Sequence, residues 1–247
     1  MAAPGELGEL ASTFDRMAEE LARAEQVRRQ LAADVAHELR TPLAALQAGL
    51  EELRDGLATP DPARLAGLHD QALRLGRVVG DLAELSAAES AALSLRMSDV
   101  DLAEVARAVL AARDAQLRAA GLQVNAELHQ GVLVRGDADR LHQALGNLVA
   151  NAARYCRPGD QVTARVRAAD GQGVVEIADT GPGIPPDDLP HVFDRLWRGH
   201  ASAATSGSGI GLAVVRELVT AHGGTVTATS PPDGGATFTI HLPLRHS

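Results

Sequence analysis

Four short blocks of this chain carry side chains that could do chemistry. Residues 37–42 read His-Glu-Leu-Arg-Thr-Pro and place a nucleophilic imidazole beside a carboxylate. Far downstream, Asn147 and Asn151 supply two amides, residues 179–183 read Asp-Thr-Gly-Pro-Gly, and residues 207–211 read Gly-Ser-Gly-Ile-Gly. Amide oxygens suit a hard metal ion, a carboxylate can read a nucleobase, and glycine turns leave room for phosphate. A phosphate donor site and a phosphate acceptor in one chain indicate phosphoryl transfer.

The block around His37 has the features of a phosphoryl acceptor. Apolar residues repeat at three and four positions and predict a helix, and His37 lies off the apolar stripe, on the side that faces solvent. An unperturbed imidazole titrates near about pH 6.5, so at neutral pH much of it is a free-base nucleophile. Glu38 can orient the ring, Arg40 can neutralise phosphate oxygens, and Pro42 introduces a local bend. By itself, the dipeptide His-Glu favours an ordinary surface helix, but the six-residue string at 37–42 on a dimerising helix favours the acceptor.

The downstream blocks have the features of a nucleotide site. Asn147 and Asn151 are spaced i, i+4, so both amides lie on one face of a predicted helix, where they could bind Mg²⁺ together with substrate phosphates. Asp179 follows a predicted strand and could accept a hydrogen bond from the exocyclic amine of adenine, whereas guanine presents an oxygen there. Gly209 and Gly211 open a helix whose N-terminal amides could hold phosphate. Each motif alone has a structural alternative: capping asparagines, a tight Asp-Gly turn and a Rossmann turn.

In this order, the four blocks resemble the H, N, G1 and G2 boxes of sensor histidine kinases, and the resemblance covers nearly the whole chain from about Glu20. It implies that Asn151 binds the metal, and that Arg154 meets phosphate. The family usually has Lys at position 154 and Thr at position 156, where this chain has Arg154 and Cys156. The residues that the resemblance assigns to nucleotide binding are Asn147, Asn151, Arg154, Tyr155, Asp179, Gly181, Gly183, Ile184, Gly207, Gly209, Gly211 and Leu212. Residues 193–198 resemble the F box, whose aromatic residues could anchor a lid or pack in the core.

The resemblance implies an ATP-dependent protein-histidine kinase. With ATP and Mg²⁺ bound, the γ-phosphoryl group would pass to His37 and then to an aspartate of a response regulator. The implied catalytic residues are His37, Glu38, Arg40 and Thr41. Thr41 lies one helical turn after His37, and in this family the residue is associated with dephosphorylating the regulator. A hydroxyl can orient the attacking water, but it can also simply bond back to the helix.

Two other classes of protein remain open. An ATPase of the same fold, as in gyrase, the heat-shock chaperone or the mismatch-repair protein, would share the nucleotide blocks but has no use for residues 37–42. A binding or scaffolding module could carry a degenerate kinase domain, although Asn151, Asp179, Gly209 and Gly211 are intact. An acid-labile, base-stable phosphate on the protein would exclude the first class, and a nucleotide titration would exclude the second.

Composition restricts the partners and the compartment. The net charge of −9 argues against nucleic acid, because phosphate backbones bind basic surfaces. Cys156 is the single cysteine, so no intramolecular disulfide can form, and a reducing, cytoplasmic location is expected. No stretch approaches the roughly 20 apolar residues of a membrane span, so no membrane contact is expected in this chain. Residues 5–24 resemble the second helix of a HAMP linker, so we expect the natural protein to have a sensor in front of Met1 and an anchor in the bacterial inner membrane.

The apolar patterns predict an α+β fold. A helical repeat reaches Leu57, and after the breakers in Gly56–Pro62 a second helix runs to about Ala88. Two such antiparallel helices form half of a four-helix bundle, so a homodimer is expected. The mixed helices and strands that follow predict an α/β sandwich with helices on one face of a sheet. The predicted domains are a HAMP-like linker at 1–24, a dimerisation and phosphoacceptor domain at 25–90, and an ATP-binding domain at 97–247.

The individual elements of the predicted ATP-binding domain follow from periodicity and turn residues. The expected helices are at 100–119, 137–155 and 210–222. The expected strands are at 122–128, 132–134, 161–168, 173–178, 224–229 and 236–242, the last two forming a closing hairpin. Residues 184–208, rich in proline, glycine and small side chains, predict a lid-like connection.

Overall fold

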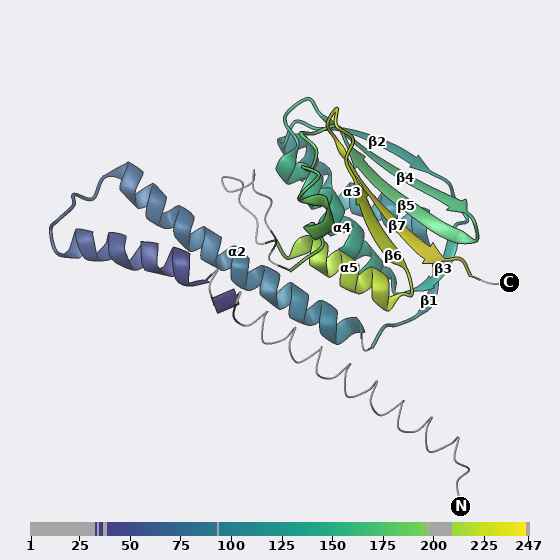
Figure 1. The fold of residues 1–247 in the computed structure, drawn as a ribbon, viewed down its shortest axis with the longest axis horizontal. Coiled ribbons are helices and arrows are strands. Elements are labelled where there is room, and N and C mark those ends of the chain that lie inside the picture. Colours follow the sequence, from purple (N-terminus) through teal and green to yellow (C-terminus); the bar gives the residue numbers. More distant parts are fainter. Residues whose placement is uncertain are drawn as a thin grey trace, which may run out of the picture. The chain divides into compact units, whose positions relative to one another are not determined.

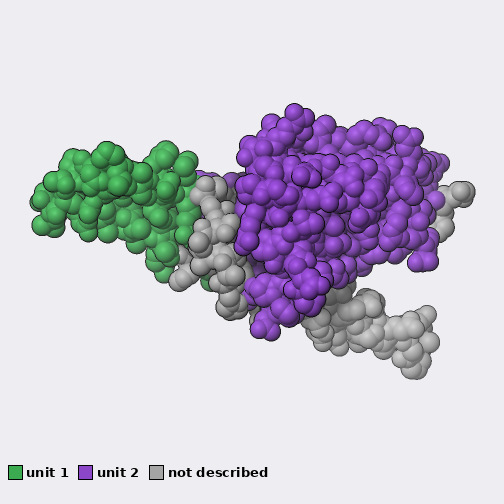
Figure 2. All heavy atoms as spheres, turned by 90° about the horizontal axis from the view of Figure 1, so that it is seen from above, with its two compact units in different colours: residues 1–75 green, residues 76–247 purple. Residues whose placement is uncertain are grey.

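The computed structural model divides into two compact units, residues 1–75 and residues 76–247 (Figure 1, Figure 2). The described residues are 33, 35–36, 39–92, 94–195, 197 and 209–245. The predicted linker at 1–24, the pair His37 and Glu38, and Gly207 lie outside them. In the part of the chain that is described, no helix is both long enough and apolar enough to cross a membrane.

A helical hairpin forms where the apolar repeats predict it. Residues 39–54 are helical, and α2 (Pro62–Ala92) follows after a short turn. Gly56 has a φ of 72°, a left-handed conformation that ends the first helix at little steric cost. Asp61 caps α2, because its Oδ1 accepts a hydrogen bond from the backbone N–H of Arg64 at 2.8 Å. The stop and start signals in this segment are therefore confirmed.

The two helices of the hairpin run antiparallel and touch closely. A β-carbon on Gly49 would lie 2.6 Å from Leu68 Cδ2, so glycine permits the close approach. One turn further along, Glu52 forms an ion pair with Arg64. Several leucines of the hairpin remain exposed in the single chain: Leu43, Leu50, Leu57, Leu65 and Leu73. The hairpin alone therefore covers only part of its apolar surface.

The second unit is built on a five-stranded mixed sheet with a layer of helices on one face (Figure 1). The strand order is β2 (Gln123–Leu128), β4 (Gln161–Ala169), β5 (Gln172–Asp179), β7 (Ala236–Pro243) and β6 (Thr225–Thr229). β2 and β4 pair in parallel, and all other neighbours in this sheet pair antiparallel. The helices are α3 (Leu102–Ala119), α4 (Ala138–Tyr155) and α5 (Gly211–Ala221), with α4 between the other two. The predicted sandwich and its closing hairpin are confirmed.

The core lies between the sheet and the helices. Alternate residues of the central strands point inward, and these include Val162, Ala164, Val166, Val175, Ile177, Phe238, Ile240 and Leu242. They meet buried residues of the helices, which include Leu145, Leu148 and Val149 of α4 and Val214, Val215 and Leu218 of α5. The Phe193 and Phe238 rings meet edge to face, with centroids 6.2 Å apart. This core fixes α4 and α5, the two helices that carry most of the predicted nucleotide residues.

The helix predicted from Val100 is wrong at its start. Residues Ser98–Asp101 form strand β1, which pairs antiparallel with β3 (Leu133–Gly136), and Val100 is buried there opposite Val134. The helix begins only at Leu102, because Asp101 caps it by accepting the backbone N–H of Ala103 at 2.9 Å. Elsewhere the predicted ends differ by a few residues; α2, for example, continues to Ala92.

Asp137 connects three parts of the second unit. Its carboxylate caps α4 by accepting the backbone N–H groups of Asp139 and Arg140 at 3.1 and 3.2 Å, and it also accepts the N–H of Arg96 at 2.9 Å. Its own backbone N–H donates to Nε2 of the buried His222 at 2.9 Å. Burial alone would raise the pKa of the Asp137 carboxyl, but these amides and the Arg140 charge together hold it below its ordinary value.

Removing this cap is expected to destabilise the domain. Asp137→Ala should lower the free energy of unfolding by about 1–3 kcal/mol at pH 7, because it leaves helix amides without acceptors. The folded-state pKa of Asp137 lies below its ordinary value of 3.8, so its stabilisation is present above 3.8 and is lost as pH falls toward the folded-state value. Urea unfolding should therefore show the difference between wild type and variant shrinking below about pH 4.

Asp139→Ala is the matched control, because it removes an exposed carboxylate from the same helical turn. It should cost less than about 1 kcal/mol. Equal losses in the two variants would show that charge near the helix end matters and that the cap does not.

Candidate functional site

The predicted metal and phosphate residues of α4 share one face of that helix. Asn147, Asn151 and Arg154 follow one another at helical spacing, and together they line a cavity of about 100 Å³ between α4 and the start of α5. The Asn147 Nδ2 group donates to the carbonyl oxygen of Gly211 at 3.3 Å, so this side chain joins the two helices. Asn151 is half-buried and Arg154 is exposed, which leaves both beside the space where a ligand would enter.

The N-terminus of α5 closes the other side of this cavity. Gly209 has a φ of 73°, a left-handed conformation that turns the chain into the helix. Among the described residues, no side chain caps α5, and a helix N-terminus of this kind favours an anion. The cavity is lined by Asn147, Ala150, Asn151, Arg154, Tyr155, Val192, Trp197, Gly209, Gly211 and Leu212. Seven of the twelve residues predicted to bind nucleotide are therefore brought together here.

Part of the connection predicted at 184–208 is held against α5 by ion pairs. Arg195 lies 3.7 Å from Glu217, and Arg216 lies 3.3 Å from Asp194. Phe193 packs in the core, whereas Trp197 lines the cavity and stacks on His191 with ring centroids 4.7 Å apart. Core packing is therefore confirmed for Phe193, and anchoring of a lid by Trp197 stays a prediction.

Asp179, Gly181, Gly183 and Ile184 are not part of that cavity lining. Asp179 ends β5, and its Oδ1 accepts the backbone N–H groups of Gly181 at 3.0 Å and Ala236 at 3.3 Å. Burial raises the pKa of the Asp179 carboxyl above its ordinary value, and those amides offset only part of the rise. A buried carboxylate in this state gains from any further donor, and the exocyclic amine of adenine is one.

The glycines after Asp179 are required by a neighbouring loop that the sequence did not point to. A β-carbon on Gly183, which has a φ of 78°, would lie 2.8 Å from Ser230 Oγ. That same hydroxyl accepts the backbone N–H of Ile184 at 2.8 Å, and Gly235 donates its N–H to the carbonyl of Gly181 at 2.8 Å. The connection between β6 and β7 thus supports the loop after Asp179. In the sequence, only the glycines of the β6–β7 connection could have indicated this contact.

Cys156 connects the two halves of the site. It ends α4 directly after Tyr155, and a β-carbon on Gly181 would lie 3.0 Å from its Sγ and 3.1 Å from Asp179 Oδ1. The helix that carries the asparagines therefore contacts the loop that carries the predicted base-reading carboxylate. In the sequence, Cys156 was notable only because sensor histidine kinases usually have Thr at this position.

The residues fit a metal that is bound mainly through its nucleotide. In the described ranges, no group of three or more His, Cys, Asp or Glu side chains could hold a metal by itself. Mg²⁺ commonly takes only one or two protein ligands and completes its octahedron with phosphates and water. The amide oxygen of Asn151 beside the phosphate-binding end of α5 is suited to that arrangement.

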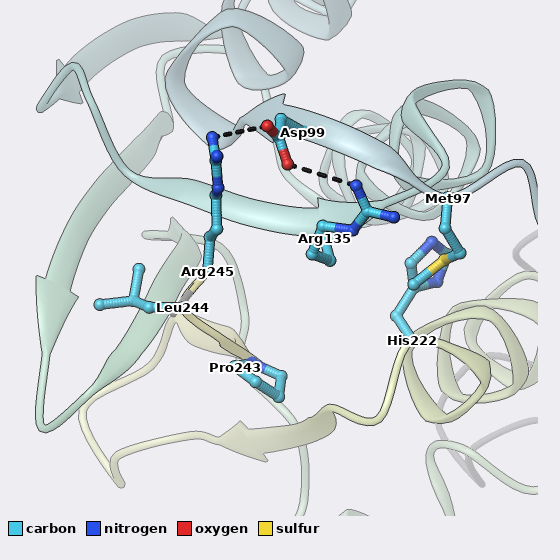
Figure 3. A pocket seen from close by; sticks show the side chains of 7 residues that line it. All are labelled: Met97, Asp99, Arg135, His222, Pro243, Leu244 and Arg245. Atoms are coloured by element: carbon cyan, nitrogen blue, oxygen red, sulfur yellow. Dashed lines mark ion pairs between the residues drawn. The ribbon is translucent and has the colours of Figure 1, made fainter. Parts of the chain in front are cut away.

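A larger cavity of about 440 Å³ lies away from these residues (Figure 3). Asp99 stands between Arg135 and Arg245, with N–O distances of 3.5 and 2.5 Å, so its charge is already paired. These contacts join Arg245, which follows β7, to the β1–β3 ribbon. None of the predicted site residues lines this cavity.

Comparisons with known proteins agree with this architecture. Residues 136–246 match the family described as Histidine kinase-, DNA gyrase B-, and HSP90-like ATPase, and residues 27–91 match the His Kinase A (phospho-acceptor) domain. Signal transduction histidine-protein kinase BaeS of Escherichia coli is 36% identical over 97% of this chain and 52% of its own length. The chain spans about half the length of the curated relatives it matches at this level.

Two solved structures extend the comparison. Acinetobacter baumannii histidine kinase AdeS is 31% identical, covers 85% of this chain and 98% of its own, and superposes with a TM-score of 0.64. Histidine kinase ThkA in complex with response regulator protein TrrA shares the fold, with a TM-score of 0.68 at 20% identity, over 93% of this chain and 66% of its own. The chain therefore belongs to the sensor histidine kinases.

Proposed function

We propose that this chain is an ATP-dependent protein-histidine kinase that phosphorylates itself on His37 and passes the phosphoryl group to an aspartate of a response regulator. The observation that carries the proposal is the shared cavity of α4 and α5, where amides, a guanidinium and uncapped helix N–H groups meet. It stands in a chain whose residues 27–91 match a phosphoacceptor domain. The proposed working parts are residues 25–90 as acceptor and residues 97–247 as ATP-binding domain.

Each side chain of the site has a distinct role in this proposal. Arg154 and the first amides of α5 bind the phosphates, and Asn147 keeps α5 at its distance from α4 through Gly211. Asn151 holds Mg²⁺, which neutralises phosphate charge when bound. Asp179 accepts a hydrogen bond from the adenine amine. Because the existing hydrogen bonds offset only part of the cost of burying this carboxylate, a further donor favours adenine over guanine. Tyr155 and Leu212 line the same space.

At the acceptor, a His37 nitrogen forms a bond to the γ-phosphorus while the bond from that phosphorus to the bridging oxygen breaks, and ADP leaves. Glu38 takes or orients the proton on the other ring nitrogen. Arg40, which is exposed on the helix at 39–54, offsets the charge of the transferred phosphate. His37 and Glu38 lie outside the described residues, so these roles rest on the sequence and on the match of this region.

The ATPase family match by itself does not separate a kinase from a gyrase-type or chaperone-type ATPase. The phosphoacceptor match at residues 27–91 favours the kinase, since those ATPases have no use for an acceptor histidine. ThkA, which shares the fold, was solved with a response regulator, and this supports an aspartate-bearing partner.

Calorimetric titration with ATP and Mg²⁺ tests whether the chain binds the nucleotide that the proposal requires. We expect saturable binding of one nucleotide per chain, and no detectable binding would overturn the proposal in favour of a degenerate module.

The proposed homodimer forms through the exposed leucines of the hairpin. Leu50 is 55% exposed in the single chain and lies on one helical stripe with the exposed Leu43. Leu50→Asp should weaken dimerisation by more than about a hundredfold, because it would bury an unpaired carboxylate in each protomer. Leu46 is half-buried within the hairpin, so Leu46→Asp would disturb the monomer as well. Light scattering at micromolar concentration is the measurement.

Ala48→Asp is the matched control for this prediction, because Ala48 is exposed on the same helix, away from the leucine stripe. It adds the same charge and should leave the dimer intact. A Leu50→Asp protein that remains a dimer would place the interface elsewhere.

We further propose that Thr41 serves dephosphorylation of the regulator. Its side chain is exposed one helical turn after the acceptor position. Thr41→Ala should leave labelling of His37 intact and slow regulator dephosphorylation by about tenfold to a hundredfold, because the attacking water loses its orienting hydroxyl. Thr41→Ser keeps the hydroxyl and should retain most of the rate. Loss of labelling and dephosphorylation together in Thr41→Ala would mean that the hydroxyl is structural.

A further inference from the structure

Cys156 lies between helix α4, which carries Asn147 and Asn151, and Asp179, the carboxylate proposed to bind the base. Its backbone ends α4, with its N–H donating to the Ala152 carbonyl at 3.0 Å. Its side chain packs against Gly181 so closely that any β-carbon at Gly181 would lie 3.0 Å from the sulfur. Asp179 Oδ1 would lie 3.1 Å from the same β-carbon, so the thiol and the carboxyl lie side by side against Gly181. The pKa of each group is accordingly affected by the other.

The thiol remains protonated at neutral pH. Burial and the nearby negative charges of Asp179 and Asp160 raise the pKa of Cys156 to about 12. A protonated thiol is a hydrogen-bond donor, whereas a thiolate beside a carboxylate would only accept. The Cys156 thiol can therefore donate to the Asp179 carboxylate beside it.

We propose that Cys156 is a positioning residue for adenine recognition, in which its S–H group holds the Asp179 carboxylate in the orientation that receives the base amine. This inference rests on the proposed ATP site. Asp179 Oδ1 already accepts the N–H groups of Gly181 and Ala236, and the thiol adds a side-chain donor from α4. The contact also ties the base-reading carboxylate to the helix that carries Asn151, so base and phosphate sites keep a fixed separation.

The test compares Cys156→Thr with Cys156→Val, two side chains of the same shape of which only threonine can donate. Adenosine is the probe, because it has no phosphate that titrates or binds metal. At pH 7.5 the Val variant should bind adenosine about threefold to tenfold more weakly than the Thr variant, whose affinity should match that of the wild type. Both measurements use the full chain, with urea midpoints recorded for each protein.

The pH profile separates positioning from packing. Adenosine needs the ionised carboxylate, so affinity falls as pH drops through the pKa of Asp179. Loss of the thiol donor raises that pKa further, so the acid fall should begin at a higher pH in Cys156→Val than in the wild type, but not in Cys156→Thr. A packing role alone would lower affinity without moving the midpoint.

The outcomes distinguish this inference from the proposed function. A wild-type chain that binds neither adenosine nor ATP overturns both. A wild type that binds adenosine, with Thr and Val variants of equal affinity and equal pH midpoints, overturns the role of Cys156 alone. Where the Val variant unfolds, the pair Cys156→Ser and Cys156→Ala poses the same question, because serine donates and alanine does not.

Discussion

Replacing His37 with glutamine is expected to abolish transfer of the γ-phosphoryl group from ATP to the protein. Glutamine keeps the polarity and much of the size of histidine, but its amide nitrogen is not a nucleophile, so no bond to phosphorus can form. Incorporation of label from γ-labelled ATP should fall below about one hundredth of the wild-type value. The ATP affinity and the dimer mass should stay near wild type, because His37 lies outside the proposed ATP-binding domain and off the predicted apolar stripe of its helix.

His69→Gln is the control for this variant. His69 is an exposed histidine of α2 that is also followed by an acidic residue, Asp70, but it lies outside the block at residues 37–42. This variant should be labelled as strongly as the wild type. Acid-labile label that persists on the His37→Gln protein would contradict the assignment of the acceptor.

Asn151→Ala and Asp179→Asn are expected to weaken nucleotide binding in two different ways. Asn151→Ala should lower the affinity for Mg²⁺-ATP about tenfold to a hundredfold and that for metal-free ATP much less, because the metal contact is what it removes. Asp179→Asn should lower the affinity for all adenine nucleotides by about thirtyfold or more, with and without metal. An amide can direct its own donor at the base amine, which leaves two donors facing each other.

Titrations with Mg²⁺ and with a chelator measure both effects. Asn125→Ala serves as control, because Asn125 is exposed on the edge strand β2 and should change neither affinity. Equal losses in the Asn151 variant with and without Mg²⁺ would count against a metal role for that residue.

The local parts of this fold could be predicted from the sequence. The turn with Gly56 and Asp61, and the amphipathic helix α4, depend on residues within a few positions of one another. Strand β1 was missed because it has only four residues and its burial depends on β3, more than thirty positions away. The parallel pairing of β2 with β4 likewise depends on the long connection through β3 and α4, and the periodicity of the strands does not predict it.

The candidate site divides in the same way. The shared face of Asn147 and Asn151 follows from helical spacing, and the structure places it on a cavity with Gly209 and Gly211. The surroundings of Asp179 could not be predicted, because Cys156, Ser230 and Gly235 reach it from distant parts of the chain. Gly181 and Gly183 were predicted to bind nucleotide, whereas packing against those residues already requires glycine at both positions.

The chemical stability of the phosphorylated protein tests the central claim most directly. The full chain is incubated with γ-labelled ATP and Mg²⁺, denatured, and divided between acid and base. A phosphoryl group on an imidazole nitrogen should be lost in acid and retained in base, and the labelled peptide should contain His37. Label that survives acid, or that maps to a peptide without His37, would contradict a histidine kinase mechanism at this residue.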